Sequence, residues 1–330
     1  MTAITETPAP VKSAEEAALQ IPGVRSERVR LANGAVAHYA TAGTSGPAVI
    51  LLHGGLPGSG GASGWRYMLP ALAEAGFRVY APDRPGFGLS DTREEYWPVR
   101  GPLSWMQFVV DFADALAIDD FFLGGNSQGA QVAALVAVNH PERVKALAMV
   151  ATSAFNAALD VPADQVQPGM GFPKWEGTVE SMREIMGTII HRGETVTDDL
   201  MEARTASALM QRESWSTGMA WVRKSGTDPN LSQLLRMKDR LDKLTLPIIY
   251  LYGRQDVMGP VENAYLQEDR LPNVQVFYPD DCGHQGQTDQ PEMFNAVFTE
   301  FFRDGKISKK TAEWAGVSTR RPVLPDIVES

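Results

Sequence analysis

The sequence predicts a mixed α/β fold in which a mostly parallel sheet is covered by helices on both faces. Six short apolar runs, rich in branched or aromatic residues, are typical of buried parallel strands. They lie near residues 47–55, 77–83, 120–127, 144–152, 246–253 and 273–280. Helix-length segments lie around residues 66–75, 104–117, 128–139 and 290–303. Strands that alternate with helices indicate right-handed crossovers and therefore a parallel sheet.

The predicted elements divide the chain into five parts. A hairpin with Asn33-Gly34 as its turn opens the core. After about residue 154 the pattern becomes helical, with many methionines and tryptophans, and strand-like runs resume at Leu246. Because this block interrupts one sheet, we expect it to form a lid over the carboxyl edge of the strands. The parts are a polar N-terminal extension (1–24), the first half of the core (25–154), the helical lid (155–243), the second half of the core (244–303) and a polar C-terminal tail (304–330).

The composition excludes several classes of function. With 44% hydrophobic and 21% charged residues, the chain resembles an ordinary globular protein. A net charge of −10 argues against nucleic acid or an anionic membrane as the main partner, since both require a basic face. No apolar stretch is long enough to span a membrane, and the N-terminus lacks a signal-peptide pattern. The single cysteine, Cys282, excludes an intrachain disulfide. We expect a cytoplasmic protein with no metal and no organic cofactor.

A serine lies between a predicted strand and a predicted helix in Gly125-Asn126-Ser127-Gln128-Gly129. This G-x-S-x-G pattern places a nucleophile on a tight turn, where the two glycines leave room for strand and helix to pass closely. The N-terminus of the following helix directs its amide groups towards developing negative charge. The alternative is that Ser127 only caps the helix.

A serine nucleophile needs a base and an acid that orients the base. His284 follows the last predicted core strand and precedes the last helix, so its loop can reach Ser127. Asp256 lies in the loop after the preceding strand, which gives the chain order Ser, Asp, His expected for this motif. We interpret Asp280 and Asp281 as turn formers.

The run His53-Gly54-Gly55 ends the predicted strand 47–55. A glycine here allows the backbone amide to face the serine, so we expect the N–H groups of Gly55 and Gln128 to form an oxyanion hole. The side chain of Gln128 is not required for this role. We expect His53 to be structural, with its ring bonded to nearby loop backbone.

Residues 25–303 resemble the α/β-hydrolase superfamily, and the closest pattern is that of the meta-cleavage product hydrolases, which break carbon–carbon bonds in ring-opened aromatic compounds. The matching residues are HGG at 53–55, GASGW at 61–65, DRPGFGLSD at 83–91, GNSQG at 125–129, GRQD at 253–256 and GH at 283–284. The resemblance implies a lid arginine that binds a substrate carboxylate, and Arg204 lies at the matching place. The alternative for Arg204 is a solvated residue on a helix face. Gly54, Asn126 and Gln285 are further predicted substrate-binding residues, and relatives often form homo-oligomers.

Four features depart from the resemblance, and all are expected to line the pocket. Gln285 replaces the usual tryptophan after the histidine, and Gln128 replaces the usual methionine after the serine. Residues 58–60 look inserted, and Tyr67 stands near the place of a common asparagine.

We expect a serine hydrolase that cleaves an acyl bond in a small carboxylate-bearing substrate derived from an aromatic compound. Carbon–carbon hydrolysis is preferred over ester hydrolysis on esters or half-esters of aromatic acids. A cofactor-free oxygenase or lyase and a ligand receptor on the same scaffold are the alternatives from other classes. A serine at position 127 excludes dehalogenase and epoxide-hydrolase chemistry, because both need a carboxylate nucleophile there.

Overall fold

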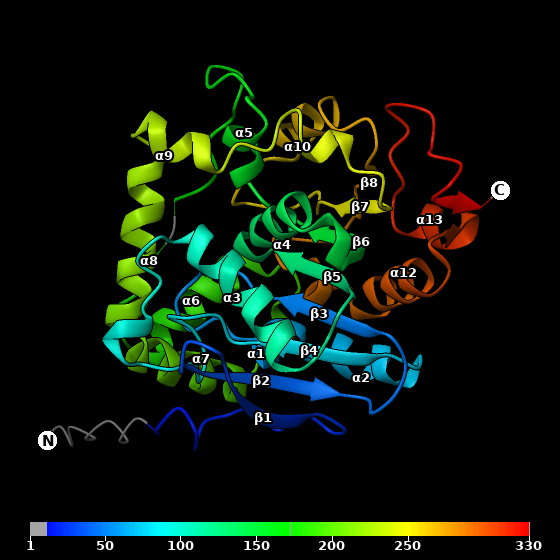
Figure 1. Cartoon of the computed structure of the whole chain (residues 1–330). Helices are drawn as coiled ribbons and strands as arrows, with labels where there is room; N and C mark the ends of the chain where they lie inside the picture. Colours follow the sequence, from blue (N-terminus) through cyan, green and yellow to red (C-terminus); the bar gives the residue numbers. More distant parts are fainter. Residues whose placement is uncertain (1–11, 172, 330) are drawn as a thin grey trace, which may run out of the picture.

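The computed structural model describes residues 12–171 and 173–329 and confirms the predicted fold class. A sheet of eight strands lies at its centre, in the order β1-β2-β4-β3-β5-β6-β7-β8 (Figure 1). Strand β2 runs antiparallel to both of its neighbours, and the other neighbouring pairs are parallel. The strands are β1 Arg25–Arg30, β2 Val36–Ala42, β3 Ala48–Leu52, β4 Arg78–Pro82, β5 Phe121–Asn126, β6 Val144–Val150, β7 Ile248–Leu251 and β8 Gln275–Phe277. All six predicted core strands and the hairpin are present.

Helices follow most of the strands, as the alternation in the sequence predicts. The core helices are α1 Gly61–Trp65, α2 Met68–Glu74, α3 Pro102–Ala115, α4 Gln128–Asn139, α5 Ala154–Ala158, α10 Val261–Glu268, α11 Gly286–Asp289 and α12 Pro291–Asp304. Between β6 and β7 lie also α6 Val179–Ile189, α7 Asp198–Met210, α8 Arg212–Ser225 and α9 Pro229–Leu234. The chain ends with β9 Ile307–Ser308, α13 Lys309–Trp314 and β10 Val328–Glu329.

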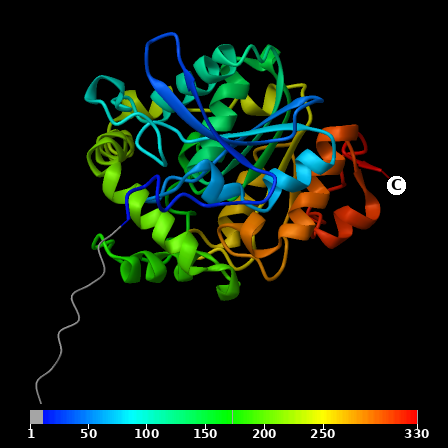
Figure 2. The ribbon, with the colours of Figure 1, turned by 90° about the horizontal axis from the view of Figure 1, so that it is seen from below.

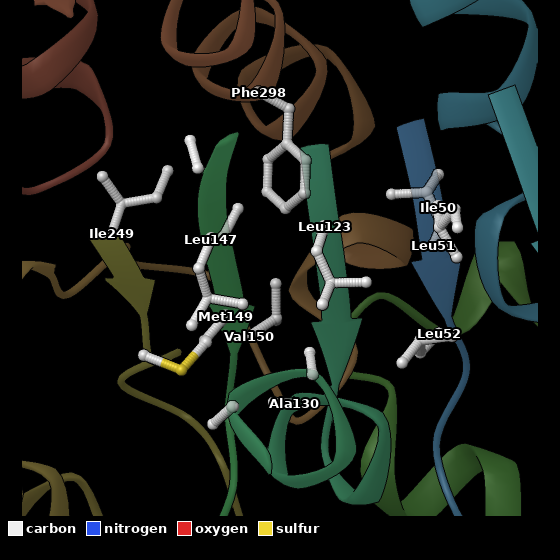
Figure 3. Packing of buried hydrophobic residues seen from close by; sticks show 14 of the residues in the cluster. Ile50, Leu51, Leu52, Leu123, Ala130, Leu147, Met149, Val150, Ile249 and Phe298 are labelled. Atoms are coloured by element: carbon white, nitrogen blue, oxygen red, sulfur yellow. The ribbon is translucent and has the colours of Figure 1, made fainter. Parts of the chain in front are cut away.

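The helices cover both faces of the sheet. Neighbouring residues on a strand point to opposite faces, so Gly124 and Gly125 of β5 show which helix lies on each side. A Cβ on Gly124 would lie 3.1 Å from the ring of Phe298 in α12, and one on Gly125 would lie 2.3 Å from the carbonyl oxygen of Gly129 in α4. Figure 3 shows Phe298 and Ala130, from these two helices, approaching the strands from opposite sides. The central strands are therefore buried on both faces, which explains their continuous apolar sequences.

Helices α6 to α9 lie at one edge of the sheet. Figure 1 shows them beside the ends towards which β3 and β5 point, which are the carboxyl ends of the parallel strands. The methionine-rich pattern reflects a small separate core. Its buried residues are Met182, Met186, Ile189, Ile190, Leu200, Met201 and Ala208. This placement suits a lid, whereas α5 packs on α4 and α10 of the core. The limits 155–243 for the lid stay a prediction.

The C-terminal segment packs on the core, although its polar composition had given it no predicted place. Figures 1 and 2 both show it beside α12, on the side of the molecule away from the lid helices. Its few apolar residues join the main core: Ile307, Ala312, Ala315, Ile327 and Val328. The buried carboxylate of Glu268 accepts a 3.0 Å hydrogen bond from Arg320 and lies 3.6 Å from Arg321. A few apolar contacts, ion pairs to one buried carboxylate and backbone hydrogen bonds to β8 therefore hold this segment.

The N-terminal extension also makes contacts where the structure describes it. Ala14 and Ala17 are buried against Ala206 of α7, and Leu19 packs against the small lid core. The predicted polar extension covers residues 1–24, and its first part, residues 1–11, lies outside the described residues. None of the helices that the structure describes is both long and apolar enough to cross a membrane.

Candidate active site

Ser127 lies at the turn between β5 and α4 with φ 57° and ψ −122°, a conformation that side-chain-bearing residues rarely adopt. The turn is this tight because strand and helix nearly touch. A Cβ on Gly125 would lie 2.3 Å from the carbonyl oxygen of Gly129, and one on Gly129 would lie 2.2 Å from that of Leu52. The serine side chain makes no capping hydrogen bond to α4. The alternative that Ser127 only caps the helix is therefore wrong.

His284 and Asp256 meet in the loops that follow β8 and β7. The imidazole Nδ1 lies 2.8 Å from Asp256 Oδ2, and both residues are buried. The other carboxylate oxygen accepts a hydrogen bond of 2.8 Å from the backbone N–H of Met258, which aims the carboxylate. His284 Nε2 is buried and finds no hydrogen-bond partner among residues 12–171 and 173–329. The Asp–His pair is thus formed, and Nε2 is free to accept a proton.

Asn126 joins the serine turn directly to the histidine loop. Its Nδ2 donates a 2.9 Å hydrogen bond to the carbonyl oxygen of His284, and its side chain is buried. The backbone N–H of His284 donates a further 2.9 Å bond to the carbonyl oxygen of Ile189, at the end of lid helix α6, and so ties the same loop to the lid. The geometry therefore indicates that Asn126 positions His284, and its contact with substrate stays a prediction.

Gly54 and Gly55 lie against the serine turn, and Gly55 adjoins Gln128, the other predicted oxyanion-hole residue. A Cβ on Gly54 would lie 3.5 Å from Ser127 Cβ, and one on Gly55 would lie 2.7 Å from the side chain of Gln128. His53 has the structural role that the sequence indicates. Its Nδ1–H donates to the carbonyl oxygen of Gly54 at 2.8 Å, and its Nε2 accepts the backbone N–H of Arg84 at 3.1 Å. Burial, together with the positive charge of Arg84, lowers the pKa of His53 to about 3, so the imidazole is neutral.

Arg204 lies on α7 and is only 1% exposed, so the alternative of a solvated arginine is wrong. Its Nη2 donates to the carbonyl oxygen of Pro57 at 3.1 Å and to Ser59 Oγ at 3.2 Å. Burial lowers the pKa of Arg204 to about 10, which leaves the guanidinium charged at neutral pH. Within the described part of the chain, no carboxylate lies within ion-pair distance of it. A buried cation without a counter-ion is a candidate site for an anion.

The departures from the resemblance occupy different places. The side chain of Gln128 accepts a 3.3 Å hydrogen bond from Arg84 Nη1, and its Nε2 lies 3.5 Å from the sulfur of Met219 in the lid. Gln285 is buried at the start of α11. Tyr67, however, lies in an outer groove with residues 19–22 and Thr197, under the guanidinium of Arg66. The expectation that Tyr67 lines the same pocket as the serine receives no support from this placement.

Three residues near the site were missed by the sequence analysis. Arg84 donates to loop carbonyls beside the serine turn, and Trp215 of α8 donates its indole N–H to the carbonyl oxygen of Gly55 at 3.0 Å. Asp289 accepts the backbone N–H groups of Gly283 and Arg192, each at 2.8 Å, and so joins the histidine loop to the lid. The only signal for Arg84 was a charged residue inside the motif DRPGFG, and nothing marked the other two.

A serine on a tight strand–helix turn, an Asp–His pair on the following loops and a mostly parallel sheet define the α/β-hydrolase class. Across residues 12–171 and 173–329, no group of three or more His, Cys, Asp or Glu side chains could hold a metal ion. The family model described as "alpha/beta hydrolase fold" matches residues 47–291, so the chain belongs to this family.

Several named relatives match most of the chain. It is 28% identical over 268 residues to a 2-hydroxy-6-oxononadienedioate/2-hydroxy-6-oxononatrienedioate hydrolase from Burkholderia vietnamiensis, covering 81% of this chain and 90% of the relative. A 2-hydroxy-6-oxo-6-phenylhexa-2,4-dienoate hydrolase from Burkholderia cepacia is 28% identical over 266 residues, covering 79% and 89%. A solved meta-cleavage product hydrolase from Pseudomonas fluorescens is 26% identical with a TM-score of 0.66, covering 84% of this chain and 98% of that one.

Proposed function

We propose that the chain is a serine hydrolase in which Ser127 is the nucleophile, His284 the general base and Asp256 the residue that orients His284. The observation that carries this proposal is the buried His284–Asp256 hydrogen bond of 2.8 Å in a loop that Asn126 ties to the serine turn at 2.9 Å. Hydrogen bonds thus hold together two loops and a turn from distant parts of the sequence.

The reaction follows from these positions. Ser127 Oγ adds to a carbonyl carbon of the substrate while its proton passes to His284 Nε2. The carbonyl oxygen becomes an oxyanion, which accepts hydrogen bonds from the backbone N–H groups of Gly55 and Gln128. When the tetrahedral adduct collapses, His284 returns the proton to the leaving group. His284 then takes a proton from a water molecule that adds to the acyl-serine, and a second tetrahedral adduct forms. Its C–Oγ bond breaks, which releases the acid, and His284 returns the proton to Ser127 Oγ.

The substrate class follows from Arg204 together with the relatives. These relatives are named for 2-hydroxy-6-oxo compounds that carry a carboxylate beside the 2-hydroxy carbon and a ketone further along the molecule, with a second carboxylate in the dioates. A buried, charged guanidinium without an acidic partner among the described residues is suited to bind such a carboxylate in a bidentate manner. We infer that the scissile bond joins the ketone carbon to the neighbouring carbon of the dienoate, so that His284 protonates a carbon leaving group.

Ester hydrolysis is the second candidate. Two polar side chains, Gln128 and Gln285, stand next to the nucleophile and the base where the meta-cleavage product hydrolases usually have methionine and tryptophan. Polar groups at these positions favour a substrate with an oxygen leaving group, such as a half-ester of an aromatic diacid. We also propose that the protein is cytoplasmic, which cell fractionation would test. A homo-oligomeric state is proposed as well, and sedimentation velocity would test it.

The experiment compares initial rates on two substrate panels with one enzyme preparation. One panel contains dienoate ring-cleavage products, and the other contains aromatic half-esters and simple aryl or alkyl esters. Ser127→Ala should lower the rate by about a thousandfold or more, as loss of a triad nucleophile does. Ser308→Ala is the matched control, because Ser308 caps α13 far from the site and should leave the rate unchanged.

Faster serine-dependent turnover of the dienoates supports carbon–carbon hydrolysis, whereas faster turnover of the esters supports the second candidate. A rate that Ser127→Ala leaves unchanged on both panels would contradict the assignment of the nucleophile.

A further inference from the structure

Arg84 is a fully buried cation beside the serine turn. It follows β4, its guanidinium lies 5.0 Å from the ring centre of Phe87 and 5.1 Å from that of Trp105, and its exposed fraction is 0%. In the part of the chain that the structure describes, no acidic side chain forms an ion pair with it. Its Nη2 instead donates to two backbone carbonyl oxygens, that of His53 at 2.7 Å and that of Gly54 at 2.8 Å.

The bond to Gly54 fixes the direction of the neighbouring amide. The peptide group between Gly54 and Gly55 is planar and trans, so its C=O and its N–H point in opposite directions. Arg84 Nη2 and His53 Nδ1–H hold this C=O from one side, each at 2.8 Å. The N–H of Gly55 must then point away from Arg84. A Cβ on Gly55 would meet Gln128 at 2.7 Å, which shows that the serine turn is adjacent to this residue.

The peptide between Gly54 and Gly55 needs hydrogen bonds to hold its orientation, because both residues are glycines. Two successive glycines have no side chain to restrict their dihedral angles, so the peptide between them can rotate at low cost. A rotated peptide would turn the carbonyl oxygen of Gly54 towards the reacting carbonyl group and remove one of the two donors. Two hydrogen bonds to a single carbonyl oxygen oppose this rotation.

The same guanidinium reaches the second donor residue. Arg84 Nη1 donates to the side-chain oxygen of Gln128 at 3.3 Å, and the backbone N–H of Gln128 is the other proposed oxyanion-hole donor. Arg84 therefore spans the loop and the start of α4 with one rigid, planar group. The positive charge of the Arg84 guanidinium, which is hydrogen-bonded to the carbonyl oxygen of Gly54, also polarises the Gly54–Gly55 peptide and makes the Gly55 N–H a stronger donor.

We propose that Arg84 is a positioning residue of the oxyanion hole, which holds the Gly54–Gly55 peptide with its N–H towards Ser127. The inference rests on the proposed serine-hydrolase function. Arg84 does not contact the substrate in this proposal, because its guanidinium lies at the carbonyl side of the Gly54–Gly55 peptide, opposite the N–H that faces Ser127. Its loss should therefore reduce stabilisation of the tetrahedral adduct and leave binding of planar ligands unchanged.

The test compares Arg84→Met and Arg84→Lys with the wild type on the substrate that is turned over fastest. Phenylboronic acid, which forms a tetrahedral adduct with a nucleophilic serine, and benzoate, which is planar, serve as the two inhibitors. Arg321→Met is the matched control, since Arg321 donates to the carbonyl oxygens of Glu268 and Leu271 in the C-terminal region.

For Arg84→Met we expect kcat to fall about a hundredfold or more, the loss typical of one oxyanion-hole donor, with KM within about threefold of wild type. The affinity for phenylboronic acid should fall in parallel with kcat, and that for benzoate should not change. Arg84→Lys, which keeps the charge but offers no planar fork, should give an intermediate kcat. Arg321→Met should match the wild type in kcat, in KM and in both inhibitor affinities.

Equal weakening of both inhibitors would mean that Arg84 supports the whole site, and it would overturn the proposal. A kcat within about threefold of wild type in Arg84→Met would overturn it as well. If Arg84→Met does not fold, Arg84→Lys decides by the same comparison of the two inhibitors. Failure of the underlying function looks different, because wild type and Ser127→Ala would then turn over the substrate equally.

Discussion

Replacing His53 by asparagine should change how the stability of the protein depends on pH. The imidazole is buried and accepts the backbone N–H of Arg84 at 3.1 Å, and the Arg84 guanidinium lies 3.4 Å from its other nitrogen. A protonated ring would lose the first contact and be repelled in the second. Burial and this neighbouring charge therefore lower the pKa of His53 from 6.5 to about 3.

Whether stability rises or falls with pH depends on how many protons the folded and the unfolded chain bind at His53. Between pH 6.5 and pH 3 the unfolded chain binds a proton at His53 that the folded chain does not, so stability is lost as the pH falls through this window. The contribution is fully present above pH 6.5. Lowering the pH from about 8 to about 5 should remove about 2 kcal/mol through this residue, because an imidazole of ordinary pKa is almost fully protonated at about pH 5.

Urea unfolding followed by tryptophan fluorescence at about pH 8 and about pH 5 measures the effect. His53→Asn should be less stable than the wild type at the higher pH, since it loses a ring that bonds the loop. Its further loss on going to the lower pH should be about 2 kcal/mol smaller than that of the wild type. Taking this difference of differences cancels the other titrating groups. An identical loss in both proteins would refute the reasoning that the fold holds His53 neutral.

Two further substitutions test the anion site and the serine turn. Arg204→Ala should raise KM for carboxylate-bearing substrates about 10- to 100-fold, which corresponds to the free energy of a hydrogen bond to a charged group, and should change KM for neutral esters little. Equal changes in KM for both kinds of substrate, measured by steady-state kinetics, would contradict a carboxylate contact. Gly125→Ala should lower the midpoint of thermal unfolding, because its Cβ would lie 2.3 Å from a backbone oxygen and such overpacking costs about 1–3 kcal/mol. Gly187→Ala in α6, where no atom lies within 4 Å of the new Cβ, should be neutral or stabilising, and similar midpoints for the two variants would contradict the close approach.

The fold, the tight turn at Ser127 and the Asp256–His284 pair could be predicted because their determinants are local in the sequence. Each core strand is apolar over its own length, and the turn around Ser127 needs its two glycines within five residues. The loops that carry Asp256 and His284 each follow a recognisable strand, and the carboxyl ends of parallel strands lie at one edge of the sheet. Chain order alone therefore placed these two residues near the serine.

The remaining features depend on contacts between distant segments. Arg204 lies in an acidic, basic and polar stretch that is typical of an exposed helix face, and its burial depends on the packing of α7 on other segments, including the loop 57–59. The C-terminal segment is polar, and its position depends on a buried Glu268 that no local pattern reveals. Arg84 reaches Gly54, 30 residues away, through a hydrogen bond that no periodicity encodes.

Covalent labelling with a fluorophosphonate tests the central claim most directly. This reagent phosphonylates a serine only when a base activates it and donors stabilise the adduct, so mass spectrometry of the digested protein locates the nucleophile. The proposed site predicts a single modification, on Ser127, that abolishes turnover and is absent from Ser127→Ala. Modification of a different residue, or full turnover by a protein whose Ser127 carries the label, would contradict the account.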